Sequence, residues 1–136
     1  MPTVFARIVS GEIPAVKVYE DDATLAFMDV NPASRGHTLV ICKAEHPDVF
    51  TVPPELLLAT ARTVQRVALA LRAALNIEGL NILQNNGAAA GQTVFHYHVH
   101  LIPRWAGDHV LRPWMPHQVE PTELHALAAQ IRAALE

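Results

Sequence analysis

Three histidines occupy every second position of residues 96–102, which read His-Tyr-His-Val-His-Leu-Ile. Successive side chains of a β-strand point to opposite faces, so His96, His98 and His100 are expected to share one face while their apolar neighbours pack in the core. Imidazoles are a poor filling for a core unless each one is hydrogen-bonded. The pattern therefore marks this strand as the candidate site of chemistry.

Three interpretations of the histidine row compete. In the first, two imidazoles of a His-x-His pair bind one metal ion, although no Cys, Asp or Glu lies in this stretch to complete the ligand set. In the second, a neutral imidazole attacks a phosphoryl or nucleotidyl centre. A neighbouring imidazole then protonates the leaving group, since a pKa of ~6.5 allows both forms near neutrality. In the third, the histidines are structural or incidental. Three histidines at period two favour the second interpretation.

The loop that precedes this strand adds to the case for phosphorus chemistry. Residues 85–93 read Asn-Asn-Gly-Ala-Ala-Ala-Gly-Gln-Thr and bring backbone N–H groups and amide side chains beside the histidine row. Such groups suit phosphate oxygens without requiring a metal. The loop is not a Walker A loop, because no Gly-Lys-Ser/Thr follows it. Its position next to the histidines is what makes it informative.

Composition excludes several classes of protein. The chain has 136 residues, 51% hydrophobic and 17% charged, which suits one globular domain over residues 1–136. A net charge of −3 argues against a nucleic-acid or membrane partner. The single cysteine, Cys42, excludes a disulfide framework and is expected to be a small buried hydrophobe. The N-terminus lacks the design of a signal peptide, so we expect a cytoplasmic protein.

Hydrophobic periodicity and turn residues predict the elements that must position the histidines. The long helix is expected to be capped by Thr51 and to end near residue 76, and Pro103 is expected to end the last strand because it cannot donate to a ladder. The predicted helices are 4–9, 51–75 and one from about 121. The predicted strands are 16–20, 25–29, 37–42, 80–83 and 94–102. This order predicts an α+β fold, a five-stranded antiparallel sheet with helices on one face.

The residues resemble the histidine triad (HIT) family. The resemblance lies in the His-x-His-x-His run preceded by Gly-Gln-Thr, in residues 5–14, and in the segments 25–29 and 36–43. It covers nearly the whole chain. It implies nucleotide hydrolases and transferases that attack an α-phosphate and form a covalent nucleotidyl-histidine, usually as homodimers joined through the long helix and its adjacent strand.

The resemblance also implies roles for individual residues. His98 would be the nucleophile, His100 the proton donor, and His96 and His37 would orient them. Oxygens of the phosphate or leaving group would be bound by Gln92, Asn85 and Thr93. The nucleoside would be bound by Phe5, Ile8, Phe27 and Leu39 around the base and by Asp29 at the ribose.

Two comparisons with the family's branches refine the expectation. Some relatives bind structural zinc through two N-terminal cysteines, where this chain has Thr3 and Ala6 beside His46 and His96. We therefore expect no structural zinc and no metal in the chemistry, with Mg²⁺ only as the companion of a polyphosphate substrate. A transferase branch replaces the third histidine by glutamine, so His100 favours hydrolysis.

The sequence thus predicts a hydrolase of purine nucleoside 5′-monophosphate derivatives, either phosphoramidates or nucleotidyl esters. The first alternative is a dinucleoside polyphosphate (Ap3A/Ap4A-type) hydrolase, in which Arg104 would meet the extra phosphates. The second is a nucleotide-binding protein without a catalytic role. Trp105 and Trp114 would either border the leaving group or simply pack.

Overall fold

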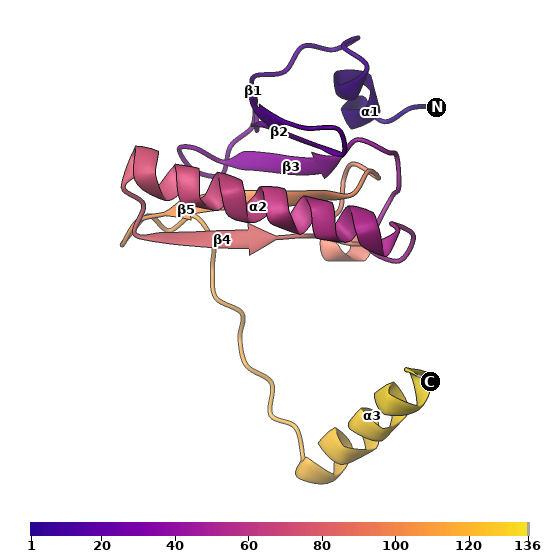
Figure 1. The fold of residues 1–136 in the computed structure, drawn as a ribbon. Helices are drawn as coiled ribbons and strands as arrows, with labels where there is room; N and C mark the ends of the chain where they lie inside the picture. The colour runs from indigo at the N-terminus through magenta and orange to yellow at the C-terminus, as the bar shows by residue number, and fades with distance from the viewer. Residues whose placement is uncertain (136) are drawn as a thin grey trace.

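Five strands form one antiparallel sheet in the order β1-β2-β3-β5-β4 (Figure 1). The computed structural model describes residues 1–135. The strands are β1 (Lys17–Glu20), β2 (Thr24–Met28), β3 (Thr38–Cys42), β4 (Gly79–Leu83) and β5 (His98–Arg104). The helices are α1 (Val4–Val9), α2 (Pro54–Leu75) and α3 (Pro121–Ala134), with a short 3₁₀ turn η1 (Ala88–Ala90). The predicted α+β class and five-stranded antiparallel sheet are confirmed.

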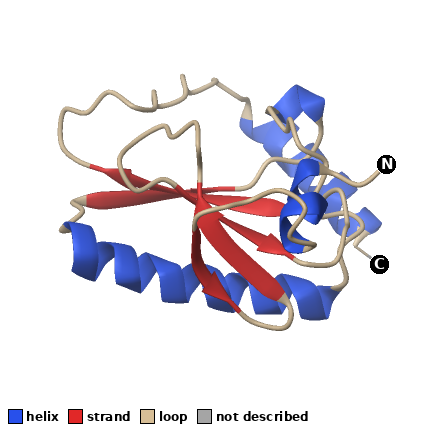
Figure 2. Ribbon diagram, turned by 90° about the horizontal axis from the view of Figure 1, so that it is seen from above, coloured by secondary structure: helices blue, strands red, loops and turns tan. Residues whose placement is uncertain are grey.

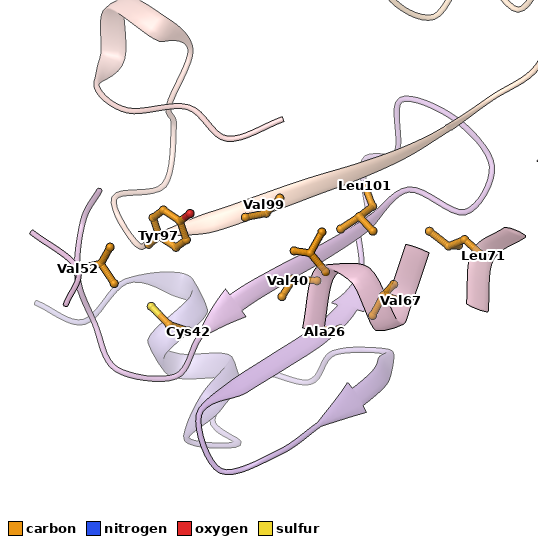
Figure 3. Packing of buried hydrophobic residues seen from close by; sticks show 10 residues of the cluster. Ala26, Val40, Cys42, Val52, Val67, Leu71, Tyr97, Val99 and Leu101 are labelled. Atoms are coloured by element: carbon orange, nitrogen blue, oxygen red, sulfur yellow. The ribbon is translucent and has the colours of Figure 1, made fainter. Parts of the chain in front are cut away.

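An apolar layer fills the space on each side of the sheet. On one side α2 packs against the sheet, and the side chains between them include Val40, Cys42, Val99 and Leu101 (Figures 2 and 3). On the other side α1 contributes a second cluster, whose buried members are Phe5, Ile8, Leu25, Phe27, Leu39 and Ile41. The sequence placed helices on one face. The small helix α1 in fact packs on the face opposite α2.

Local chemistry explains where the helices begin and end. The hydroxyl of Thr3 accepts a hydrogen bond from the N–H of Ala6 at 3.0 Å and so caps α1. The helix α2 begins without a side-chain cap at Pro53 and ends at Asn76 in the left-handed conformation. The prediction that Thr51 caps α2 is wrong, because its hydroxyl donates to Asp48 instead.

The strand β5 differs from its prediction at both ends. It begins at His98 rather than at residue 94, and it runs through Pro103 to Arg104. Pro103 is tolerated because β3 pairs with β5 only as far as Leu101. The carbonyl oxygen of Pro103 accepts a hydrogen bond from the hydroxyl of Ser34 at 2.7 Å. This oxygen lies on the side of β5 that faces β3, where the pairing between the two strands has already ended. N–H and C=O of one residue point to the same side of an antiparallel strand, so no ladder bond is lost there.

Residues 105–120 are irregular and lead to α3, which lies apart from the sheet (Figure 1). The helix begins where the sequence predicts, but none of its residues is buried. In the described part of the chain, no helix is long and apolar enough to cross a membrane.

Gly36 lies in the turn before β3 and directly precedes His37. A substitution at Gly36 therefore tests how this turn positions the site. The φ of Gly36 is +91°, and an added Cβ would lie 2.5 Å from Leu75 Cδ1 and 3.2 Å from Pro103 Cγ. Gly36→Ala is expected to lower the free energy of unfolding by about 2–4 kcal/mol, from backbone strain plus overpacking. Urea denaturation measures the change. In the control Gly11→Ala, where φ is +84° and nothing lies within 4 Å, only the backbone strain applies. Equal losses in both variants would contradict the packing argument.

Candidate active site

A cavity of about 500 Å³ lies on the α1 face of the sheet. This volume falls in the range of small-molecule sites. Its apolar wall includes all four residues predicted to hold a base, namely Phe5, Ile8, Phe27 and Leu39. Its polar lining includes the predicted residues Asp29, Thr93, His98 and His100. Its lining also includes residues that the sequence did not single out, among them Ile13, Ala15, Val30 and Val94.

A backbone hydrogen bond determines the tautomer of His98. Its Nδ1 lies 2.6 Å from the carbonyl oxygen of His96. A carbonyl oxygen can only accept, so Nδ1 carries the proton and Nε2 keeps a free lone pair. The side chain is 6% exposed and lines the cavity, with the Phe5 ring edge-on at 4.9 Å between centroids. Burial lowers the pKa of His98, which keeps the ring neutral and nucleophilic.

A second chain of hydrogen bonds sets the tautomers of His37 and His100. The N–H of Ala33 donates to His37 Nδ1 at 2.9 Å, so the proton of His37 sits on Nε2. His37 Nε2 lies 3.0 Å from His100 Nδ1, which must therefore accept. His100 then carries its own proton on Nε2. Burial lowers the pKa of both rings, and the nearby carboxylate of Asp29 partly opposes that effect.

His96 is completely buried and does not line the cavity. Its Nε2 donates to the carbonyl oxygen of Cys42 at 2.6 Å, and its Nδ1 accepts from the hydroxyl of Thr3 at 2.9 Å. Burial lowers the pKa of His96 as well. The ring thus fixes the segment whose carbonyl holds His98, and the orienting role that the resemblance implies stays a prediction. The sequence flagged Thr3 only as a missing zinc ligand, and nothing in the pattern indicated this hydrogen bond.

Asp29 lines the cavity at its polar end, with a side chain 17% exposed. One carboxylate oxygen accepts from the N–H of Asn31 at 2.8 Å, and the other lies 3.5 Å from His37 Nε2. The turn residues that follow β2 therefore hold the carboxylate in place while leaving acceptor capacity for a ligand hydroxyl.

Gln92 differs from its expected position. It is 4% exposed and absent from the cavity lining, and its Oε1 accepts from the N–H of Gly87 at 2.7 Å. Its Nε2 donates to the carbonyl oxygens of Pro47 and Val94. The amide thus braces the loop before β5 rather than facing a ligand. Asn85 also lies outside the cavity lining.

Two groups of side chains contain potential metal ligands. At the position where the family resemblance implies a zinc site in some relatives, both ring nitrogens of His96 are already hydrogen-bonded, and Thr3 and Ala6 supply no thiolate, so these residues do not fit zinc. Asp29, His37 and His100 place one ligand atom each within 4.8 Å of one another. The Ala33 N–H keeps the proton of His37 on Nε2, the nitrogen that would have to bind the ion.

Comparison with known proteins identifies the family of the chain. A family model described as HIT domain matches residues 10–107. Protein hit of Bacillus subtilis is 41% identical over 97% of this chain and 93% of its own length. Adenylylsulfatase HINT3 of Arabidopsis thaliana is 39% identical over 89% of this chain and 64% of that longer protein.

Solved structures share the fold. A HIT family protein from Bacillus anthracis has a TM-score of 0.92 at 40% identity, covering 98% of this chain and 96% of that one. A histidine triad nucleotide-binding protein from Candida albicans has a TM-score of 0.88 at 30% identity, covering 98% and 97%. A zinc-bound histidine triad protein from Mycobacterium smegmatis has a TM-score of 0.76 at 44% identity, covering 96% of each. With the family model spanning most of the chain, and His98 and His100 lining the cavity, the chain belongs to the HIT family.

Proposed function

We propose that this protein is a hydrolase of purine nucleoside 5′-monophosphate derivatives that works through a covalent nucleotidyl-histidine on His98. One observation carries the proposal. His98 and His100 line the same cavity with ring centroids 5.0 Å apart, and their hydrogen bonds give one a free lone pair and the other an N–H. A nucleophile beside a proton donor is the arrangement that displacement at phosphorus requires.

The proposed reaction has two steps. His98 Nε2 forms a bond to the α-phosphorus, and the bond from phosphorus to the leaving group breaks. The leaving group departs with that electron pair and takes the proton from His100 Nε2, after the His37–His100 pair has gained one proton from solvent, so that the pair is neutral at the end of the step. Water then attacks phosphorus and gives up a proton to the neutral His37–His100 pair, while the P–N bond breaks and its electron pair returns to His98. Hydrogen bonds to backbone carbonyls keep the nucleophile oriented through both steps.

The cavity supports a nucleotide as the ligand. The apolar wall around Phe5 and Phe27 suits a planar base, and Asp29 can accept hydrogen bonds from ribose hydroxyls. Thr93 and His100 line the same cavity as His98 and would contact the phosphate in this proposal. Among the relatives, the name adenylylsulfatase supports a reaction at an adenylyl group, and a nucleotide-binding structural neighbour supports the ligand class.

Phosphoramidates and nucleotidyl esters are favoured over dinucleoside polyphosphates. The guanidinium of Arg104, which was expected to meet extra phosphates, donates to Asp108 at 2.7–3.2 Å and to Asn81 at 2.6 Å. This arrangement leaves it outside the cavity lining. We expect kcat/KM for an AMP amide to exceed that for a diadenosine polyphosphate by more than about tenfold, a difference of roughly 1.4 kcal/mol in barrier. The opposite preference would reverse the assignment.

A homodimer also belongs to the proposal. The strand β4 lies at the edge of the sheet and pairs only with β5 among the described residues, and Ile82 on it is 52% exposed. An open apolar edge of this kind pairs readily with another chain.

The nucleophile is tested by the mass of the intact protein after mixing with an activated AMP aryl ester. A rapidly quenched sample, kept away from acid because P–N bonds are acid-labile, should show one AMP adduct on wild type and none on His98→Ala. The control His125→Ala changes an exposed histidine of α3 and should form the adduct like wild type. Equal adducts on His98→Ala and wild type would place the nucleophile elsewhere. Failure of wild type to consume the ester would favour a binding protein without turnover.

The proton donor is tested by varying the leaving group. His100→Gln keeps an N–H donor but cannot deliver a proton at neutral pH. We expect it to lower kcat/KM for an AMP amide by about 10²–10⁴-fold, because an amine leaves poorly without a proton. For an AMP ester of nitrophenol, which leaves as an anion, the loss should stay below about tenfold. Equal losses on the two substrates would show that His100 acts only in binding.

The lowered pKa of His98 predicts the pH dependence. Only the unprotonated ring attacks, and burial places its pKa below the ordinary value of about 6.5. The kcat/KM for the nitrophenyl ester should therefore decline on the acid side with a midpoint below pH 6.5. A profile measured at constant ionic strength gives the midpoint of the decline. A midpoint above 6.5 would contradict the neutral, buried nucleophile.

A further inference from the structure

Thr3 connects the start of the chain to two segments that are distant in sequence. Its hydroxyl oxygen accepts a hydrogen bond from the N–H of Ala6 at 3.0 Å, which caps α1. The same hydroxyl lies 2.9 Å from Nδ1 of His96, 93 positions further along the chain. The main-chain N–H of Thr3 donates to Glu45 Oε1 at 2.8 Å. One residue thus joins α1, the segment after β3 and the histidine row.

The surroundings of His96 determine the direction of its hydrogen bond to Thr3. His96 Nε2 lies 2.6 Å from the carbonyl oxygen of Cys42, which can only accept. The proton of the neutral ring therefore sits on Nε2, and the hydroxyl of Thr3 must donate to Nδ1. This hydroxyl donates on one side and accepts on the other. Serine has the same capacity, whereas valine and alanine have neither function.

Burial makes the hydroxyl of Thr3 difficult to replace. The His96 side chain is 0% exposed, and every buried side-chain nitrogen or oxygen among the described residues has a hydrogen-bond partner. Without the donor, Nδ1 of His96 would be buried and unpaired, which is costly. The ring could then turn about its remaining hydrogen bond. The hydroxyl therefore holds the His96 ring in one orientation.

Two routes lead from Thr3 to His98. The first passes through His96, whose carbonyl oxygen lies 2.6 Å from His98 Nδ1 and accepts its proton. The second passes through α1, because Phe5 lies on the helix that Thr3 caps. The Phe5 ring meets the His98 ring edge-on, with 4.9 Å between centroids, and the His96 ring at 6.0 Å. A change at Thr3 therefore reaches both supports of His98.

The same contacts occupy the position where the family resemblance implies a structural zinc in some relatives. One structural neighbour is a zinc-bound histidine triad protein. In this chain Thr3 uses the lone pair of His96 that a metal ion would need, and Ala6 offers a main-chain N–H where a thiolate would be required. Hydrogen bonds thus connect the two segments here.

From these observations we propose that Thr3 is a positioning residue for His98. Its hydroxyl holds His96 and α1 together without a metal ion, and this fixes the ring that attacks phosphorus. The inference rests on the proposed function only in naming His98 as the nucleophile. The hydrogen bond of His98 can be measured in the free protein, whether or not the protein hydrolyses a nucleotide.

The first test follows the Nδ1 proton of His98 by NMR in protein labelled with ¹⁵N on histidine. Its exchange with water requires that the hydrogen bond to the His96 carbonyl open. Thr3→Val fills the same space without a hydroxyl, and Thr3→Ala lacks the hydroxyl without filling the space. Both should exchange at least about fivefold faster than wild type, the factor that corresponds to one net hydrogen bond. Thr3→Ser keeps the hydroxyl and should resemble wild type.

The matched control is Ser10→Ala, which removes a hydroxyl from the other end of α1. That hydroxyl donates to the carbonyl oxygen of Arg7 at 3.0 Å and is not hydrogen-bonded to His96. The control should exchange like wild type. Three results would each overturn the proposal: slow exchange in Thr3→Val and Thr3→Ala, fast exchange in Thr3→Ser, or exchange in Ser10→Ala as fast as in Thr3→Val.

The second test measures single turnovers of the AMP nitrophenyl ester. In Thr3→Val the maximal rate of adduct formation on His98 should fall about tenfold, because a small displacement of a reacting group is costly. The ester concentration that gives half of that rate should change less than the rate itself. A loss confined to that concentration would show a role in binding only and overturn the proposal. Absence of any adduct on wild type would refute the proposed function, and the NMR comparison would still decide the role of Thr3.

The third test removes metal ions. Dialysis of wild type against EDTA should change neither the exchange of the His98 proton nor the rate of adduct formation, because hydrogen bonds hold His96. Faster exchange or a slower rate after dialysis, reversed by one equivalent of zinc chloride, would show that a metal ion holds this junction and would overturn the proposal.

Discussion

A hydrogen bond of 2.6 Å between His98 Nδ1 and the carbonyl oxygen of His96 decides what the cavity can do. The acceptor belongs to the backbone and cannot change its role, so the lone pair of His98 must lie on the other nitrogen. The remaining contacts hold that acceptor in place. The ring of His96 is fixed by the Cys42 carbonyl on one side and the Thr3 hydroxyl on the other. In this site the tautomers are set by main-chain groups, which do not titrate.

The two apolar layers make this arrangement rigid. The sheet is buried between α2 on one face and the α1 cluster on the other, so β3 and β5 cannot shift against each other without opening both. Phe5 connects the α1 cluster with the histidines of the candidate site. Its ring packs edge-on against Phe27, His96 and His98 and also lines the cavity. A six-residue helix is thus enough to close one wall of the site, provided that Thr3 caps it.

Much of this architecture can be predicted from the sequence, because side-chain periodicity reflects burial. The faces of β5 follow from alternation, and Val99 and Leu101 do pack in the core while His98 and His100 line the cavity. The failures involve contacts between segments distant in sequence. Phe95 was expected in the core but is 48% exposed, since β5 begins only at His98.

Hydrogen bonds to main-chain groups explain most of the other differences between the sequence-based prediction and the structure. Gln92 has the residue type of a phosphate ligand, yet loop carbonyls and an N–H satisfy its amide. Pro103 reads as a strand terminator, and only the extent of β3 shows why it is tolerated. The N–H of Ala33, which orients His37 and through it His100, carries no signal in the residue type, because every residue except proline has one.

The single cysteine has a consequence for the conditions under which the protein can work. Cys42 is fully buried, its thiol donates to the Ala44 carbonyl, and burial raises the pKa of that thiol to about 11. Only roughly one molecule in ten thousand then carries the thiolate at pH 7, and that fraction is shielded from oxidants. The residue whose carbonyl anchors His96 is therefore resistant to oxidation. The histidine row should keep its geometry across changes in cellular redox potential, without any reductant to maintain it.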